Sequence, residues 1–268
     1  MKILLSSKDV LFGLLFASMA AVAVAEADGV SWKSPAFLVD SFVELAMKNG
    51  YSTRQNPVRK WMTPVRYFIV HRVGDADLHR ELIDTHFQHL AEVTGLSIQS
   101  VDARAAANFL VVLTSEIALE SEVPRYFGSG PLSQNTMLFR HSLCLATFAT
   151  DRRGTIVRAV AMIPVDAARA RADLASCVVE ELTHAMGLGN DTMQPLPSIF
   201  SRKSNLAFLS GLDHMVLKML YDPRIKPGMD EKAVRPVLQK IAGEYERNGF
   251  FATADRDAAE NGLARLMP

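Results

Sequence analysis

The chain has 268 residues, of which 49% are hydrophobic, and its 29 basic and 29 acidic side chains give a formal net charge of zero. This length fits one domain, or one domain with an extension. The lack of a basic excess argues against nucleic acid as a partner.

The first 25 residues have the pattern of a secretory signal peptide. Lys2 and Lys8 form a positive start, residues 11–25 form an apolar run, and residues 23–25 read Ala-Val-Ala, a signal-peptidase pattern. The run is shorter than the ~18 apolar residues of a spanning helix, so cleavage is favoured over a membrane anchor. We expect a mature chain that starts near Glu26, is periplasmic or secreted, and makes no further membrane contact, because no second long apolar run follows.

Hydrophobic periodicity predicts the elements of the mature chain in order. The first half is expected to hold a helix over residues 34–49, a strand over 61–73, a helix over 77–94 and a strand over 108–113. A loop rich in Gly, Pro, Ser and Asn follows over residues 124–136, and two strands, 144–150 and 155–164, flank a hairpin turn at 151–154. Helices are expected over residues 168–186, 207–220 and 233–245.

This order predicts an α+β fold in which a mixed β-sheet precedes a long helix and a helical C-terminal part. It is the order of a zincin-type metalloprotease domain. We therefore divide the chain into a signal peptide (1–25), a zincin-like domain (26–231) and a C-terminal helical extension (232–268). The sequence carries no indication of an oligomeric state.

The chain contains two cysteines, Cys144 and Cys177. In an exported protein such a pair is most simply a disulfide. Metal-binding thiolates are the alternative, but neither cysteine has the short-spaced partner that such sites use.

Residues 180–191 read Glu-Glu-Leu-Thr-His-Ala-Met-Gly-Leu-Gly-Asn-Asp. The layout is that of the zinc-protease motif HExxHxxGxxH, with histidine replaced at the first and third ligand positions. Glu180 and His184 lie four residues apart on one helix face, so both can point at one ion. Glu181 is offset by one residue and flanks that ion, where a carboxylate serves as general base.

The return of the chain completes the candidate site. A glycine at position 187 permits a left-handed turn at the helix end, so Asn190 or Asp191 can reach the same ion. Zinc needs at least three protein ligands, and Asp191 is a better ligand than the neutral amide of Asn190. An oxygen-rich set of this kind would also suit harder cations.

Each of these residues also has a structural interpretation. His184 can hydrogen-bond Glu180 or another neighbour, and Glu181 can accept hydrogen bonds from backbone that the helix crosses. Glu180 can cap the turn at Asn190 and Asp191, which themselves favour turns after a helix end.

Other patterns carry less weight. His86 and His89, three residues apart on a predicted helix, are interpreted as surface residues rather than as a metal pair, and Asp213 as a cap or anchor of the 207–220 helix. Neither a G-x-S-x-G elbow nor a phosphate-binding glycine pattern is present.

The segment from Glu180 to Tyr221 resembles the C-terminal half of a metzincin. Residues 197–200, Pro-Ser-Ile-Phe, are similar to the tight turn that lies under the metal in that family, and residues 209–221 to its closing helix. The phenylalanine of this turn stands where metzincins have methionine, at a position that packs and does not bind.

Most of the mature chain also resembles an exported proteobacterial family, the domain of unknown function 2927. The shared elements are Cys177, residues 180–182, 187–188, 190–191 and 198–200, Leu-Tyr-Asp-Pro at 220–223 and Pro-Gly-Met at 227–229. The activity of that family is not established. The resemblance also includes the strand near Trp61 and the region of Cys144.

Two hypotheses for function follow. In the first, the protein is a zinc-dependent peptidase of the cell envelope, with Glu181 as general base and Glu180, His184 and Asp191 or Asn190 as metal ligands. In the second, it is a non-catalytic zincin-like domain that binds an envelope polypeptide or partner protein.

Overall fold

A mostly parallel sheet organises the computed structural model, which describes residues 32–48, 55–127 and 143–266. The strand order is β1-β6-β4-β2-β3, all parallel, and β5 pairs antiparallel with β6. The strands are β1 (Lys60–Trp61), β2 (Val65–His71), β3 (Ile98–Ser100), β4 (Phe109–Thr114), β5 (Leu145–Thr150) and β6 (Thr155–Pro164). The predicted α+β class with a mixed sheet is therefore confirmed.

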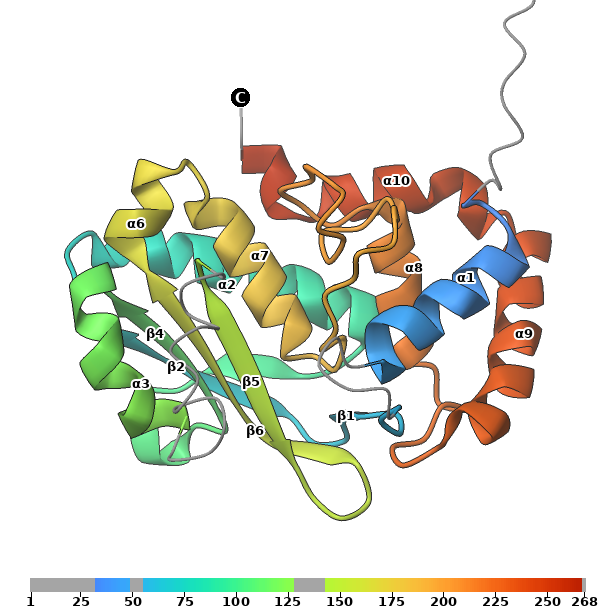
Figure 1. The fold of residues 1–268 in the computed structure, drawn as a ribbon, viewed down its shortest axis with the longest axis horizontal. Coiled ribbons are helices and arrows are strands. Elements are labelled where there is room, and N and C mark those ends of the chain that lie inside the picture. Colours follow the sequence, from blue (N-terminus) through green and yellow to red (C-terminus); the bar gives the residue numbers. More distant parts are fainter. Residues whose placement is uncertain (1–31, 49–54, 128–142, 267–268) are drawn as a thin grey trace, which may run out of the picture. The chain divides into compact units, whose positions relative to one another are not determined.

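Helices cover both faces of this sheet (Figure 1). The principal ones are α1 (Pro35–Phe42), continued by a π-helical turn (Val43–Met47), α2 (Ala76–Thr94), α3 (Leu119–Phe127), α6 (Val165–Ala170), α7 (Leu174–His184), α8 (Gly211–Leu220), α9 (Glu231–Arg247) and α10 (Phe250–Glu260). Short 3-10 turns lie at Arg104–Ala106, Glu116–Ala118 and Leu263–Leu266.

The alternating strand residues explain the two layers. Phe109 and Val111 of β4 belong to the large core beneath α2 and α7, whereas Val112 and its cross-strand neighbours form a second core with Val123 of α3. Both faces of β4, and of β6 from Ala159 to Pro164, are thus largely buried, which accounts for the apolar sequence there. The large core holds α7 against β5 and β6 and so positions the motif.

The elements differ from the predictions in identifiable places. The expected strand over residues 61–73 is divided at Pro64, which has no N–H for a ladder, so β1 pairs with β6 and β2 with β4. The expected helix over residues 168–186 is divided at Ala172, whose φ of +59° is left-handed. β3, α3 and α10 were not predicted. Of the expected loop, residues 128–136 lie outside the described residues, as does the predicted signal peptide.

The C-terminal helices pack on the rest of the helical layer. α9 contacts α1, and α10 contacts α8. Residues Ser31–Pro268 form one compact unit. Within the described part of the chain, no helix is both long and apolar enough to pass through a membrane.

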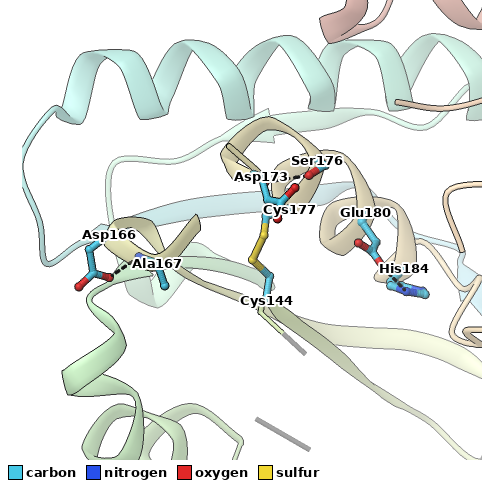
Figure 2. The surroundings of a disulfide bond; sticks show 8 residues. All are labelled: Cys144, Asp166, Ala167, Asp173, Ser176, Cys177, Glu180 and His184. Carbon is cyan, nitrogen blue, oxygen red and sulfur yellow. Dashed lines mark hydrogen bonds and ion pairs between the residues drawn. A yellow bond between two sulfur atoms is a disulfide. The ribbon is translucent and has the colours of Figure 1, made fainter. Parts of the chain in front are cut away.

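The predicted disulfide is confirmed. Cys144 and Cys177 are bonded, with their Cα atoms 5.8 Å apart, and the bond joins the start of β5 to α7 (Figure 2). Closing a loop of this size stabilises the fold by roughly 3–4 kcal/mol in the chain-entropy model.

Candidate functional site

The last turn of α7 presents the first two site residues. Glu180 and His184 lie one helical turn apart, on the part of α7 that follows the disulfide (Figure 2). His184 Nε2 is 3.9 Å from Glu180 Oε1. The expected sharing of one helix face by these two side chains is therefore present.

Gly187 turns the chain back toward them. Its φ is +116°, and a Cβ atom built there would lie 2.2 Å from the carbonyl oxygen of Arg59. No other residue fits this position without moving β1, so the glycine is required by both conformation and space. The reversal carries Leu188 and Asp191 to the imidazole of His184.

Three side chains converge after this reversal. Asp191 Oδ1 lies 2.9 Å from His184 Nε2. One ligand atom each from Glu180, His184 and Asp191 lies within 4.8 Å of the others. Arg202 approaches the outer oxygen of Asp191 at 3.4 Å and is half exposed. Three of the five residues predicted around the ion are thus brought together as a group that can hold a metal.

The hydrogen bonds of His184 define its protonation. A carbonyl oxygen only accepts, so the contact with Leu188 O requires a proton on Nδ1. Nε2 faces a carboxylate, which when ionised also only accepts, so Nε2 must carry either a proton or a cation. The second arrangement is the usual one for a metal-bound histidine, whose other nitrogen is held by a backbone carbonyl or a carboxylate.

The charges of the site are strongly coupled. Burial opposes the charged form of His184, but the hydrogen bond and charge of Asp191, together with the two glutamates, raise its pKa to about 10. Burial likewise opposes ionisation of Asp191, yet His184 and Arg202 hold its pKa below the usual range. In the metal-free protein, His184 and Asp191 therefore form an ion pair at neutral pH.

Glu181 lies on the inner side of the helix. Its side chain is buried, and it accepts a hydrogen bond from the backbone of Ala146 on β5. Burial, and next the charge of Glu180, raise the pKa of Glu181 well above its usual value. Burial also raises the pKa of Glu180. The expected contact between Glu181 and backbone that the helix crosses is present.

The side chain of Asn190, which the sequence offered as a metal ligand, hydrogen-bonds to backbone instead. Its amide nitrogen donates to the backbone carbonyl of Glu44, 2.9 Å away, and its side chain is buried. Thr192 donates to the carboxylate of the same glutamate. Asn190 and Thr192 thus fasten the return loop to the turn that follows α1, whereas Asp191 faces His184.

A tight turn lies beneath the imidazole. The ring of Phe200, which is buried, has its centroid 4.4 Å from that of His184. Asp213 accepts hydrogen bonds from Ser198 Oγ, Ile199 N and the N-cap residue Ser210. It forms a capping box at the start of α8 and ties this helix to the turn, so its predicted role as cap and anchor is confirmed.

The interpretation of the α2 histidines as surface residues is wrong. His86 and His89 are buried, because they lie on the side of α2 that packs against α7 and α8. His86 Nε2 donates to Thr183 Oγ1, which itself donates to Val179 O. Burial, and next the nearby His89 and His214 respectively, lower the pKa of His86 to about 3 and that of His89 to about 4.

Some contacts of the site had no signal in the sequence. The backbone groups of Ala146 and Leu188 reach Glu181 and His184, but any residue other than proline supplies such groups. Arg59 and Phe148 lie against Gly189 beside the return loop, although they are 130 and 41 positions away from it in the chain.

Comparison with known proteins identifies a family but not an activity. The family model described as "Protein of unknown function (DUF2927)" matches residues 35–240, which is most of the chain. The search of the curated proteins gives no match. The match includes β1, the disulfide and the whole of the site described above. The chain therefore belongs to the DUF2927 family.

Proposed function

We propose that this protein is an exported, metal-dependent peptidase with a zincin-like fold, in which Glu180, His184 and Asp191 hold a divalent cation and Glu181 is the general base. The observation that carries the proposal is the convergence of these three ligand atoms within 4.8 Å. The signal-like N-terminal sequence and the disulfide support a periplasmic location.

The donor set fits such an ion. One imidazole nitrogen and two carboxylates satisfy the minimum of three protein ligands for zinc, and the carboxylates also suit harder divalent cations. The proton on His184 Nδ1 leaves Nε2 as the ligand atom, directed at Asp191. A bound cation would supply Lewis-acid polarisation of a peptide carbonyl.

The chain's own residues would provide the proton transfers and positioning. Glu181 would take a proton from the attacking water and later donate it to the departing amine. Its raised pKa strengthens it as a proton acceptor. The ring of Phe200 would support the imidazole of His184 from below, and the carbonyl oxygen of Leu188 would hold it through the hydrogen bond from Nδ1.

Elemental analysis of the purified mature protein, after reconstitution with zinc, tests the metal site. We expect about one equivalent of zinc, lost in His184→Ala and kept in His71→Ala, a histidine outside the cluster. No bound metal in the wild-type protein would overturn the metal assignment.

A second experiment tests catalysis. Glu181→Gln should abolish peptide cleavage while leaving metal content and folding unchanged. Full activity in this variant would exclude Glu181 as the general base.

A second candidate function is favoured by the burial of Glu181. The whole residue is only 6% exposed. Its carboxylate already accepts a hydrogen bond from the backbone of Ala146 on β5. His184 and Asp191 likewise satisfy each other as an ion pair. These contacts support a non-catalytic domain that binds an envelope polypeptide, with the motif retained for structure. In that case a chelator would leave the melting temperature unchanged, because no ligand is removed from the folded state.

A further inference from the structure

Arg59, just before β1, is a partly buried cation that has no counter-charge among the described residues. Its Nε atom is buried and makes no hydrogen bond. Throughout the described ranges, no ion pair or hydrogen bond involves its guanidinium group, whose contact is with the ring of Phe148.

Such an arginine is unusual because buried polar groups are normally hydrogen-bonded and buried charges paired. Burial lowers the pKa of Arg59, and no carboxylate opposes this effect. An anion that entered the site could make bidentate hydrogen bonds with the guanidinium, the geometry in which arginine binds carboxylates most strongly.

Phe148 and Gly189 lie next to the guanidinium group of Arg59. Its guanidinium carbon lies 4.9 Å from the centroid of Phe148, which provides a flat apolar support. Gly189 lies against both: a Cβ atom there would be 3.5 Å from an Arg59 terminal nitrogen and 3.2 Å from the Phe148 ring. Because Gly189 is exposed, this position is open to solvent beside the return loop.

The position also has a definite relation to Glu181. Ala146 and Phe148 are two residues apart on β5, so their side chains share the face that packs on the core beneath α7. The backbone of Ala146 bonds to Glu181, and Phe148 supports Arg59. At about 3.4 Å per residue, Ala146 and Phe148 are about 7 Å apart along the strand.

We propose that Arg59 binds a carboxylate of the polypeptide substrate, close to the peptide bond that is cleaved. This inference rests on the proposed peptidase function. The return loop that Arg59 contacts at Gly189 also carries Asp191, so a peptide bound at the three-residue cluster passes beside Arg59. The carboxylate belongs either to the C-terminus of the peptide or to an acidic side chain, and both present the same planar pair of oxygens.

Three short peptides separate these sources: acetyl-trialanine with a free C-terminus, the same peptide as its C-terminal amide, and acetyl-Ala-Glu-Ala amide. Affinities are measured by calorimetry on the zinc-reconstituted mature protein carrying Glu181→Gln, so that cleavage does not consume the peptide. We expect at least one of the two carboxylate peptides to bind about tenfold or more tightly than the neutral amide. The one that does so identifies the source.

Variants at Arg59 test the assignment. Arg59→Gln should reduce the affinity for the preferred peptide to that of the neutral amide, and Arg59→Lys, which cannot bind bidentately, should lie between. Arg158→Gln, at an exposed arginine of β6, is the matched control and should change nothing. Equal affinities for all three peptides, a preference unchanged by Arg59→Gln, or no binding at millimolar concentration would each overturn the inference.

Stability provides a readout that is independent of catalysis. Because Arg59 is unpaired in the free protein, Arg59→Met should leave the urea midpoint unchanged or raise it. A large fall in the midpoint would identify a structural role instead. If the carboxylate preference is found but the wild-type protein cleaves no peptide, the peptidase proposal fails while the binding role of Arg59 stands.

Discussion

Replacement of Gly187 by alanine should destabilise the protein more than the same change at any other glycine among the described residues with a positive φ. Two effects combine. A φ of +116° costs a non-glycine residue about 1–3 kcal/mol. The new Cβ would lie 2.2 Å from a backbone oxygen of Arg59, and relieving such overpacking costs about another 1–3 kcal/mol. We therefore expect a total loss of about 2–6 kcal/mol.

Two other glycines separate these effects. Gly95 also has positive φ, +72°, but nothing lies within 4 Å of its added Cβ, so Gly95→Ala should cost only about 1–2 kcal/mol. Gly74 has open space and no positive φ, so Gly74→Ala should change stability by no more than about 1 kcal/mol.

The assay is urea unfolding of the three variants with the disulfide intact, followed by tryptophan fluorescence and circular dichroism. Coincident transitions from both probes would justify a two-state treatment. If Gly187→Ala is destabilised no more than Gly95→Ala, the close approach to Arg59 does not exist in solution, and the explanation of the chain reversal fails.

The remaining predictions concern pH. Since the pKa of His184 in the metal-free fold, about 10, exceeds its ordinary value of 6.5, the contribution of His184 to stability is complete below pH 6.5 and is lost as the pH rises toward 10. NMR titration of its ring should show a midpoint near 10, and His184→Gln should flatten the alkaline loss of stability. The buried histidines act in the opposite sense, because the pKa of His86, about 3, and that of His89, about 4, lie below the ordinary value. As the pH falls below 6.5, these histidines become protonated in the unfolded state before they do so in the folded state. Protonation of each histidine should therefore lower the free energy of unfolding by about 2 kcal/mol at pH 5.

Matched controls keep these two effects apart. Asp191→Asn should move the His184 midpoint toward 6.5 while leaving the acid limb of the stability profile unchanged. His89→Phe should reduce the acid loss and leave the alkaline limb as it was. A ring midpoint near 6.5 in the wild-type protein would contradict the ion pair, and equal unfolding free energies at pH 7 and pH 5 would contradict the burial of the neutral histidines.

The parts of the fold that sequence patterns predicted correctly are those with local causes. The hydrophobic spacing of α2 and the turn at residues 151–154 between β5 and β6 are set within a few residues. The division of the helix before the motif was not predictable in this way, because Ala172 has no glycine-like signature for its left-handed conformation. The division at Pro64 had a local signal, the missing N–H, which the β-rich character of its surroundings outweighed.

The same distinction applies to the site. The helical spacing of Glu180 and His184 and the turn at Gly187 are local, and the structure contains them. The choice of Asp191 over Asn190 as the partner of His184 depends on Glu44, whose carbonyl engages the Asn190 amide from a remote helix. Position in the chain cannot reveal such a contact. The contact of Arg59 with Gly189, 130 positions away in the chain, is equally invisible until the fold is known.

The disulfide has a consequence for when the site can be assembled. It fastens Cys144, two residues before Ala146, to Cys177, one helical turn before Glu181, and so fixes the strand and the helix that meet at Glu181. Thiols remain reduced in the cytosol. For an exported hydrolase, the bond would therefore form only after translocation, so the newly made chain would reach its working geometry outside the compartment whose proteins it could damage.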